Sequence, residues 1–380
     1  MAPPILTRLG PYPVAQFMRE HWQRRPLLIR QALSGFRSPV AREQLFDLAA
    51  RDDVESRCVT AFRGRWRLAH GPFAPAQLPS TACRQWTLLV QGLDLHLPAA
   101  YALLQRFRFV PDARLDDLMA SYATDGGGVG PHVDSYDVFL IQAHGQRRWR
   151  ISRQRDLALV PGLPLKILAD FRPGAEWVLE PGDVLYLPPG VAHEGVALGE
   201  CITLSVGFRA PGWQELVEPW FVRQAERHRL QGRYADPGAA PTRRPGRLPP
   251  GLIEQAWRRL SLLRPRRGDA VDVLLAELTE PKAQVVFQRP RRPMSLDAFA
   301  AAAAQGRFDV RTDARSRCLY AGRRFGINGE VLPAADFDRR LAQLADLGRV
   351  DANLLRGAPA KLLARLHEWH VAGWLHCEVT

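Results

Sequence analysis

Short apolar and aromatic runs, separated by glycine and proline, dominate the first 210 residues of the chain. Such runs are typical of β-strands joined by turns. Two early stretches, Val14–Trp22 and Arg42–Ala50, instead follow the period of an amphipathic helix. The predicted strands are Val138–Gln142, Arg147–Ser152, Glu176–Leu179, Asp183–Leu187 and Cys201–Phe208, with a short turn between the first two. Short strands joined by turns favour a double-sheet jelly roll.

The pattern changes after residue 210, where helical periodicity replaces the strand-like runs. The segment Gly232–Gly251 is rich in Pro, Gly and Arg and is predicted to be a linker or exposed loop. Asn328 and Gly329 predict a hairpin within Phe325–Val331. Helices are predicted at 213–230, 252–263, 270–278, 296–305 and 334–347. The sequence therefore predicts an α+β chain with domains at 1–210, 211–290 and 291–380.

Charge favours a polyanionic partner, because the formal net charge is +13. A charge of this sign attracts RNA, DNA or ribosomal assemblies without selecting a sequence. Lys166, Lys282 and Lys361 are the only lysines among the 52 basic residues. Since this bias is compositional, the position of an arginine must support any role that we assign to it.

The cysteines and the apolar stretches indicate the compartment. The five cysteines are scattered and none forms a C-x-x-C pair, which argues against a disulfide framework or a structural zinc module. The N-terminus lacks the apolar core of a signal peptide, and no stretch approaches the roughly 20 apolar residues of a membrane span. We therefore expect a cytoplasmic protein outside the membrane.

The sequence His132-Val133-Asp134 carries the main chemical signal. Residues at i and i+2 of an extended segment project to one side and can bind one ion. His193 is a suitable third ligand, because the turn, strand and tight loop of Glu180–Gly190 lead directly to it. Two histidines and one carboxylate leave positions open on an octahedral ion, as in non-heme iron(II) oxygenases. An H-x-D triplet alone is weak, so the order of these elements within one β domain supports the site.

Arg147 is the predicted anchor for a dicarboxylate co-substrate. Along the strand Arg147–Ser152, alternation points Arg147, Trp149 and Ile151 to one face and Arg148 and Arg150 to the other. If that first face is the barrel interior, the buried guanidinium needs a bidentate partner such as the distal carboxylate of 2-oxoglutarate.

Two other motifs resemble a phosphate-binding loop and a second metal site, and we predict neither. The glycines between Gly126 and Gly130 lack the pattern of a phosphate-binding loop and are interpreted as a flexible or tight approach to the metal strand. Near the C-terminus, His367 and His370 are three residues apart instead of four, and no third ligand is evident. We interpret them as part of a helix surface or a domain contact.

Three stretches closely resemble the bacterial ribosomal oxygenases: Asp117–Arg150 with its Gly-Pro-His-Val-Asp, Glu180–Gly195 with its Pro-Gly-Asp and Pro-Pro-Gly, and Ser205–Pro211. Those are jumonji-domain arginine hydroxylases of a large-subunit ribosomal protein (L-sixteen), related to the human ribosomal histidine hydroxylases. The resemblance is dense over about residues 60–212. It implies a jumonji or cupin-like double-stranded β-helix, a helical dimerisation region and a winged-helix-like C-terminal domain.

The same resemblance implies the roles of individual residues. It places Fe(II) at His132, Asp134 and His193, the distal carboxylate of 2-oxoglutarate at Arg147, and the co-substrate beside Ser121 and Thr203. It also implies hydroxylation of an arginine at the expense of 2-oxoglutarate, which becomes succinate and carbon dioxide.

The expected partners follow from this activity. A substrate arginine needs a carboxylate and an aromatic face, for which Asp125 and Tyr136 beside the metal motif are the candidates. The expected partners are a ribosomal protein, a second copy of the chain, and ribosomal RNA at the basic surface.

Two alternatives stay open at this point. One is another jumonji or cupin metalloenzyme, such as a histidine hydroxylase, a demethylase or a cupin isomerase that needs no 2-oxoglutarate. The other is a basic protein that binds the ribosome or RNA and keeps only a vestigial metal site.

Overall fold

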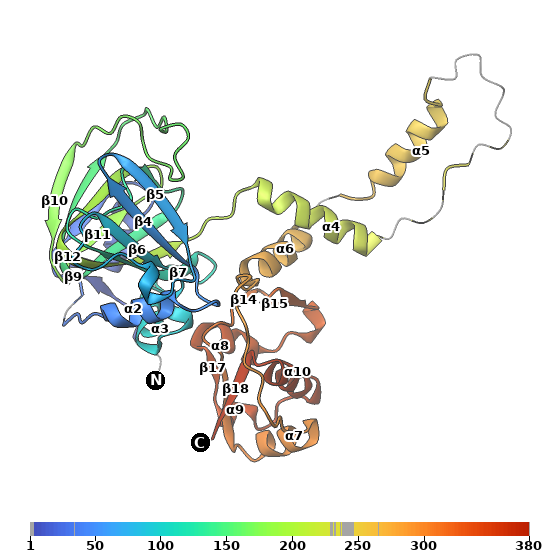
Figure 1. Ribbon diagram of the computed structural model, residues 1–380. Coiled ribbons are helices and arrows are strands. Elements are labelled where there is room, and N and C mark those ends of the chain that lie inside the picture. The colour runs from blue at the N-terminus through green and yellow to red at the C-terminus, as the bar shows by residue number, and fades with distance from the viewer. Residues whose placement is uncertain are drawn as a thin grey trace. The chain divides into compact units, whose positions relative to one another are not determined.

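The computed structural model describes residues 4–33, 35–228, 231, 233–235, 237, 247–264 and 266–379. These residues form two compact units (Figure 1), one of residues 1–210 with 282–289 and 313–315, the other of the remaining segments. Within the described ranges, no helix is long and apolar enough to span a bilayer. Most of the linker predicted at 232–251 lies outside the described residues.

The first unit is a β-barrel of jelly-roll type whose antiparallel strands pair in the order β3-β11-β9-β12-β7-β6-β4-β5. Two further strands join it, β10 on β9 and β8 on β12. The strands are β3 (Leu27–Ile29), β4 (Ser56–Phe62), β5 (Arg65–His70), β6 (Trp86–Val90), β7 (Leu115–Ala123), β8 (His132–Val133), β9 (Asp137–Ser152), β10 (Ala175–Leu179), β11 (Val184–Leu187) and β12 (Ala192–Phe208). Outside the barrel are the pair β1 (Arg8–Leu9) and β2 (Tyr12–Pro13), and the helices α1 (Val14–Glu20), α2 (Arg42–Ala49) and α3 (Pro98–Gln105).

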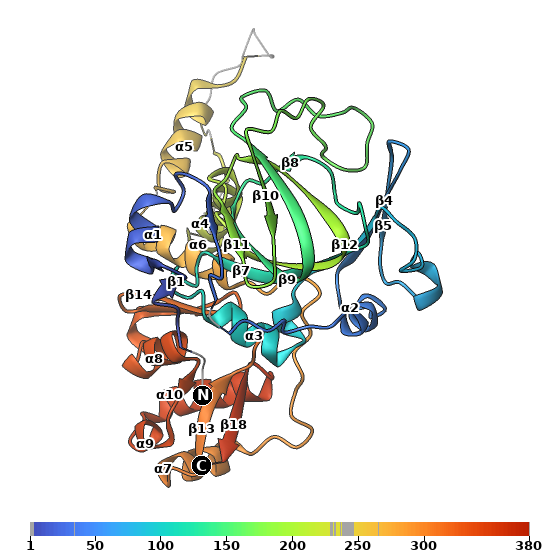
Figure 2. The ribbon, with the colours of Figure 1, turned by 90° about the vertical axis from the view of Figure 1, so that its left-hand side faces the viewer.

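The predicted turn between the strands at 138–142 and 147–152 is wrong, because β9 runs without a break from Asp137 to Ser152 (Figure 2). Gly145, which lies between the two predicted strands, has φ +59° and lies at a register shift between β9 and β12. A side chain there would meet the Glu200 carbonyl oxygen. Gly145 therefore makes a bulge that bends the strand and lets it continue.

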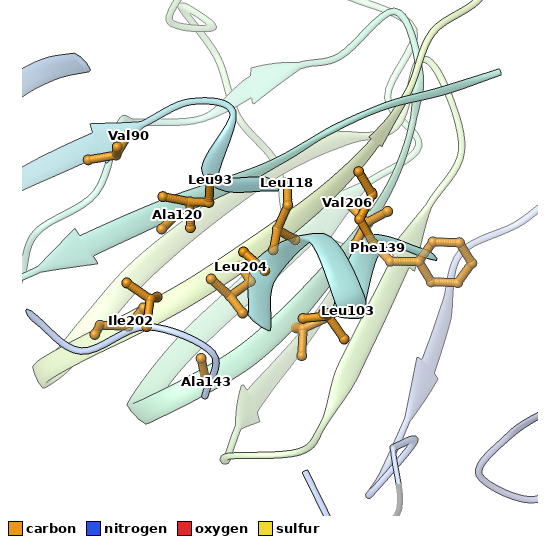
Figure 3. Packing of buried hydrophobic residues seen from close by; sticks show 14 of the residues in the cluster. Val90, Leu93, Leu103, Leu118, Ala120, Phe139, Ala143, Ile202, Leu204 and Val206 are labelled. Atoms are coloured by element: carbon orange, nitrogen blue, oxygen red, sulfur yellow. The ribbon is translucent and has the colours of Figure 1, made fainter. Parts of the chain in front are cut away.

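The core of the barrel is aromatic and aliphatic. Phe17 of α1 contacts Phe139 and Tyr186, with ring centroids 5.3 and 4.8 Å apart. Figure 3 shows Leu103 of α3 among the barrel residues Leu118, Leu204 and Val206, all in one buried cluster. Burial of this apolar surface is the main stabilising term for the barrel.

A buried pair of carboxyl groups lies at one end of β7. Asp94 accepts a hydrogen bond from the Leu118 amide at 2.9 Å, and Asp117 accepts one from Lys282 at 3.1 Å. Burial, and then the neighbouring Asp117, raise the pKa of Asp94 to about 7 from 3.8. A carboxyl group whose pKa is raised by folding contributes most stability below its unfolded pKa and loses that contribution as pH rises through its folded pKa.

We expect this carboxyl group to make the protein less stable as pH rises from about 4 to about 7. Asp94→Asn keeps an acceptor for Leu118 and carries no charge, so it should reduce the slope of the unfolding free energy against pH by at most about 1.4 kcal/mol per pH unit. Denaturant unfolding at a series of pH values measures this slope. Asp53→Asn, which alters an exposed pair with Arg51, is the control. An unchanged slope in Asp94→Asn would contradict the expectation.

The second unit combines helices with two small sheets, β17-β13-β18 and β14-β15-β16. Its helices are α4 (Val217–His228), α5 (Pro250–Leu260), α6 (Arg267–Thr279), α7 (Leu296–Ala304), α8 (Arg339–Leu347), α9 (Ala352–Leu355) and α10 (Ala360–Val371). Its strands are β13 (Phe308–Thr312), β14 (Cys318–Ala321), β15 (Arg324–Ile327), β16 (Glu330–Leu332), β17 (Arg349–Val350) and β18 (Leu375–Val379). The winged-helix-like form of residues 291–380 stays a prediction.

Turn chemistry explains one success and one error in this unit. The hairpin predicted at Asn328-Gly329 is confirmed, with positive φ at both residues between β15 and β16. The single helix predicted at 334–347 is wrong: a short 3-10 turn precedes α8, which begins after Asp338. The Asp338 carboxylate accepts a hydrogen bond from the Arg340 amide and so caps the new helix.

Candidate active site

The two histidines of the predicted triad lie opposite each other on paired strands. His132 of β8 and His193 of β12 are direct partners in the antiparallel register, and their ring centroids are 4.2 Å apart. Cross-strand partners project to the same face of a sheet. The barrel therefore brings together two imidazoles that are far apart in the sequence.

Backbone hydrogen bonds fix the orientation of both rings. His132 Nδ1 donates to the Gly130 carbonyl at 2.9 Å, and His193 Nδ1 donates to the Val191 carbonyl at 3.0 Å. With each Nδ1 engaged in this way, Nε2 is the ring nitrogen of each histidine that can bind a metal ion. This is the usual arrangement around a metal-binding histidine.

Asp134 follows β8 directly and completes the cluster. Its carboxylate oxygens lie 3.9 Å from His132 Nε2 and 3.6 Å from His193 Nε2. One ligand atom from each residue lies within 4.8 Å of the other two, which is close enough for one ion to bind all three. Among the residues that the structure describes, no other His, Cys, Asp and Glu group of this kind occurs.

Electrostatics keep the cluster ready for a cation. Burial, and then the nearby His132, lower the pKa of His193 to about 3. Burial raises the pKa of the Asp134 carboxyl, while His132 acts against this effect. A neutral His193 imidazole beside the Asp134 carboxylate suits a divalent ion.

The glycines before His132 allow the backbone to pass through a crowded place. A Cβ on Gly127 would lie 2.4 Å from the Trp86 carbonyl oxygen, and one on Gly128 would lie 2.5 Å from that of Gly195. Gly126 and Gly130 also have positive φ values. The segment is therefore a tight approach to the metal strand, one of the two forms that we expected.

Arg147 is buried in the barrel interior with most of its hydrogen-bonding capacity unused. The residue is 4% exposed, and Nη1 donates to Ser121 Oγ at 3.2 Å. Nε and Nη2 have no hydrogen-bond partner. The predicted alternation is also seen, because Trp149 and Ile151 are buried while Arg148 and Arg150 are half-buried. A buried guanidinium with two unused donors is unfavourable by itself and fits a carboxylate ligand.

Ser121 and Thr203 are direct partners on β7 and β12, and both side chains are buried. Ser121 contacts the guanidinium, as described above. The Thr203 hydroxyl donates to Gln142 Oε1 at 2.9 Å, and Gln142 in turn donates to the carbonyls of His144 and Gly145. Gln142 therefore orients Thr203, a role that the sequence analysis did not find because Gln142 lies in the middle of a hydrophobic strand.

The two predicted substrate residues differ in their surroundings. Asp125 accepts a hydrogen bond from the Gly199 amide at 2.9 Å and forms an ion pair with Arg84, and these contacts lower its pKa. Tyr136 is partly exposed, and burial followed by the charge of Asp134 raises its pKa. The Asp125 carboxylate already has a structural function, whereas Tyr136 is exposed two residues after Asp134. Contact of either residue with a substrate stays a prediction.

The C-terminal histidines have structural contacts. His367 Nε2 donates to the Met294 carbonyl at 2.7 Å, and His370 Nδ1 donates to that of Leu375 at 3.1 Å. Both lie on α10, where His370 is buried beside Phe299. This agrees with one of the two forms that we expected, a contact within the domain.

Comparisons with known proteins agree with this geometry. Residues 102–216 match the model of the JmjC domain. The ribosomal protein uL16 3-hydroxylase of Escherichia coli (strain K12) is 40% identical over 242 residues, which cover 63% of this chain and 64% of that protein, slightly less than two thirds of its length. The X-ray structure of E. coli ycfD superposes with a TM-score of 0.83 at 30% identity, covering 98% of this chain and all of that chain. A structure of the same ribosomal oxygenase in complex with cobalt and 2-oxoglutarate has a TM-score of 0.79 at 31% identity, covering 96% of this chain and 98% of that one.

Proposed function

The chain belongs to the JmjC-domain ribosomal oxygenases, and on that premise we propose that it hydroxylates an arginine side chain of the large-subunit ribosomal protein uL16. It is an Fe(II)- and 2-oxoglutarate-dependent oxygenase. The observation that carries the proposal is the joint presence of the His132, Asp134 and His193 cluster and the buried, incompletely paired guanidinium of Arg147.

Different residues would bind the metal ion and the co-substrate. His132, Asp134 and His193 would hold the iron and leave coordination positions open for 2-oxoglutarate and dioxygen. Arg147 would bind the distal carboxylate of 2-oxoglutarate, with Ser121 holding the guanidinium in place. Thr203 of β12 lies opposite Gln142 of β9, and its hydrogen bond to Gln142 fixes its side chain.

Iron with bound 2-oxoglutarate and dioxygen supplies the oxidant that inserts oxygen into an unactivated C–H bond. The protein itself orients the reactants and excludes water from the reactive centre. The barrel wall around Trp149 and Ile151 is buried and excludes water, which protects a reactive centre from side reactions. Tyr136 offers an aromatic face near the metal, where a substrate guanidinium could stack.

Mass spectrometry of uL16 tests the function directly. The purified protein, supplied with Fe(II), 2-oxoglutarate and recombinant uL16, should add the mass of one oxygen atom to an arginine and release succinate in equal amount. Omission of 2-oxoglutarate is the control. Succinate without modified arginine would contradict the substrate, and oxygen found on a histidine would favour the histidine hydroxylase alternative. If no succinate formed with any ribosomal protein, the oxygenase activity would be excluded.

We also propose a homodimer built on the second unit. The amphipathic helix α5 exposes Ile253, Trp257 and Leu260, spaced so that they share one face. An exposed apolar face of this kind is typical of an interface, and a second copy of the chain is the simplest partner. Light scattering should give twice the mass of the chain, and Trp257→Asp should give a monomer. Glu254→Ala in the same helix is the control, and a monomeric wild-type protein would contradict the proposal.

Ribosomal RNA is the proposed partner of the basic rim near the metal. Arg65 and Arg67 of β5 are exposed and flank Trp66, which lies against Gly130, two residues before His132. A rim of cations at the mouth of a site attracts a phosphate backbone. The double variant Arg65→Glu, Arg67→Glu should bind an rRNA fragment more weakly. The slope of its log affinity against log salt concentration should fall in magnitude by about two. If the double variant bound the rRNA fragment as tightly as the wild type at low salt, this surface would not be an RNA-binding site.

A further inference from the structure

The segment that joins β9 to β10, residues 153–174, lies against the short strand that leads to the metal cluster; it is the long green loop near the top of Figure 2. We call it the β9–β10 loop. Directly before β8, the Leu168 amide of this loop donates to the Pro131 carbonyl at 2.8 Å. Directly after β8, the Gly190 amide donates to the Asp134 carbonyl at 3.0 Å. Since β8 has only two residues, contacts of this kind must help to fix its direction.

The Ile167 side chain packs against the glycine that orients His132. Gly130 has φ +78°, and a Cβ on it would lie 3.0 Å from Ile167 Cδ1 and 3.2 Å from Trp66 Cζ2. The carbonyl of the same glycine accepts the hydrogen bond from His132 Nδ1 at 2.9 Å. Ile167 is 5% exposed, so this contact is buried. A shift of Gly130 away from Ile167 would therefore turn the His132 ring.

Backbone hydrogen bonds inside the loop hold Ile167 and Leu168 in place. The Val160 amide donates to the Ile167 carbonyl at 2.9 Å, and the Ala169 amide donates to that of Ala158 at 2.8 Å. These bonds make a narrow hairpin within the loop. The two residues that contact the metal strand are thus presented by an ordered element.

Gln154 closes the loop at its base. Its Nε2 donates to the carbonyls of Asp156 at 2.6 Å and Asp170 at 2.7 Å, and its Oε1 accepts from the Arg172 amide at 2.9 Å. One side chain therefore joins the two ends of the loop with three hydrogen bonds. All three partners belong to the loop, so an effect of Gln154 on a bound ion must pass through the loop.

We propose that the β9–β10 loop is a positioning element of the metal site, in which Ile167 sets the direction of the His132 ring and Gln154 keeps the loop closed. The inference rests on the proposed function, because it takes a metal ion at the cluster as given. Groups that orient a metal-binding histidine usually contribute a factor of about 10 to 100 to the metal affinity. Here a buried apolar contact with Gly130 makes that contribution.

Titration of the metal-free, full-length protein with Co(II) tests the proposal, with neither 2-oxoglutarate nor a ribosomal substrate present. The visible absorption of Co(II) reports both the affinity and the coordination geometry. Ile167→Ala removes the atoms that touch Gly130, so the dissociation constant should rise about tenfold and the absorption bands should shift. Ile167→Val keeps Cγ1, which lies 3.1 Å from the Cβ position of Gly130, and should bind Co(II) nearly as the wild type does.

Ile29→Ala is the matched control. Ile29 is 1% exposed, and its Cγ2 lies 3.1 Å from the Cβ position of Gly10, which also has a positive φ. This variant should have a lower melting temperature and unchanged affinity and bands for Co(II). Hydrogen exchange of the metal-free proteins adds a readout that needs no ion: the Leu168 amide should lose protection in Ile167→Ala and keep it in Ile29→Ala.

Unchanged affinity and bands for Co(II) in Ile167→Ala, or the same changes in Ile29→Ala, would overturn the proposal. If Ile167→Ala did not fold, Gln154→Ala should bind Co(II) more weakly than Gln146→Ala, which alters an exposed contact of β9 with Glu180. Equal affinities of these two variants would overturn the proposal as well. A wild-type protein that bound no Co(II) would instead contradict the proposed function itself.

Discussion

Replacement of Asp134 by alanine is expected to abolish turnover, with a loss in kcat of about 10³-fold or more, because the ion loses its only anionic ligand. The two imidazoles that remain, on His132 and His193, are neutral and hold a divalent ion more weakly. Succinate release measures the activity, and metal content after dialysis measures the cause. We expect both to fall together.

Asp53→Ala is the control for this variant, because Asp53 is an exposed aspartate of the same unit that pairs with Arg51. It should retain both activity and metal. Full metal content in an inactive Asp134→Ala protein would show that the carboxylate is not a ligand. Full activity in that variant would remove the metal centre from the mechanism.

Replacement of Arg147 by methionine is expected to raise the KM for 2-oxoglutarate by about 10²-fold, since it removes the buried partner of a carboxylate. The same change should not lower stability in the absence of 2-oxoglutarate. Two guanidinium nitrogens have no partner in the barrel, and an apolar side chain of similar volume avoids that cost. Thermal unfolding with and without 2-oxoglutarate measures both effects.

Arg148→Met is the matched control, since Arg148 is the next residue and lies on the opposite face of β9. Its KM should be unchanged. The 2-oxoglutarate anchor would have to be placed elsewhere if the two variants had the same KM, or if added 2-oxoglutarate stabilised Arg147→Met as much as the wild type.

Local sequence patterns predicted the parts of the site that depend on alternation and turns. The inward direction of Arg147 follows from a period of two, and the hairpin at Asn328-Gly329 follows from residues that accept positive φ. The metal triad needed more: the order of motifs and the resemblance to a family brought His193 beside His132. Strand pairing, which no local pattern reports, is what brings them together.

The errors in the prediction have physical reasons. A short turn was predicted between Gln142 and Arg147, although a bulge at Gly145 keeps this segment within one strand. Strands β4 to β7 were not predicted as strands. The function of Gln142 depends on Thr203, a partner from another strand, so the sequence near Gln142 could not show it. Asp125 was chosen because it is near the metal motif, yet Arg84 and Gly199 already engage its carboxylate.

The main-chain pairing of β8 with β12 affects which metal ion occupies the site in the cell. Because the folded barrel itself aligns the two imidazoles, removal of the ion by a chelator should leave an empty but intact receptor. Such a preformed metal site can bind any divalent cation that the cell supplies. Zinc and copper ions bind nitrogen and oxygen ligands more tightly than iron does. The supply of iron, and its competition with other cations, would then govern the active fraction.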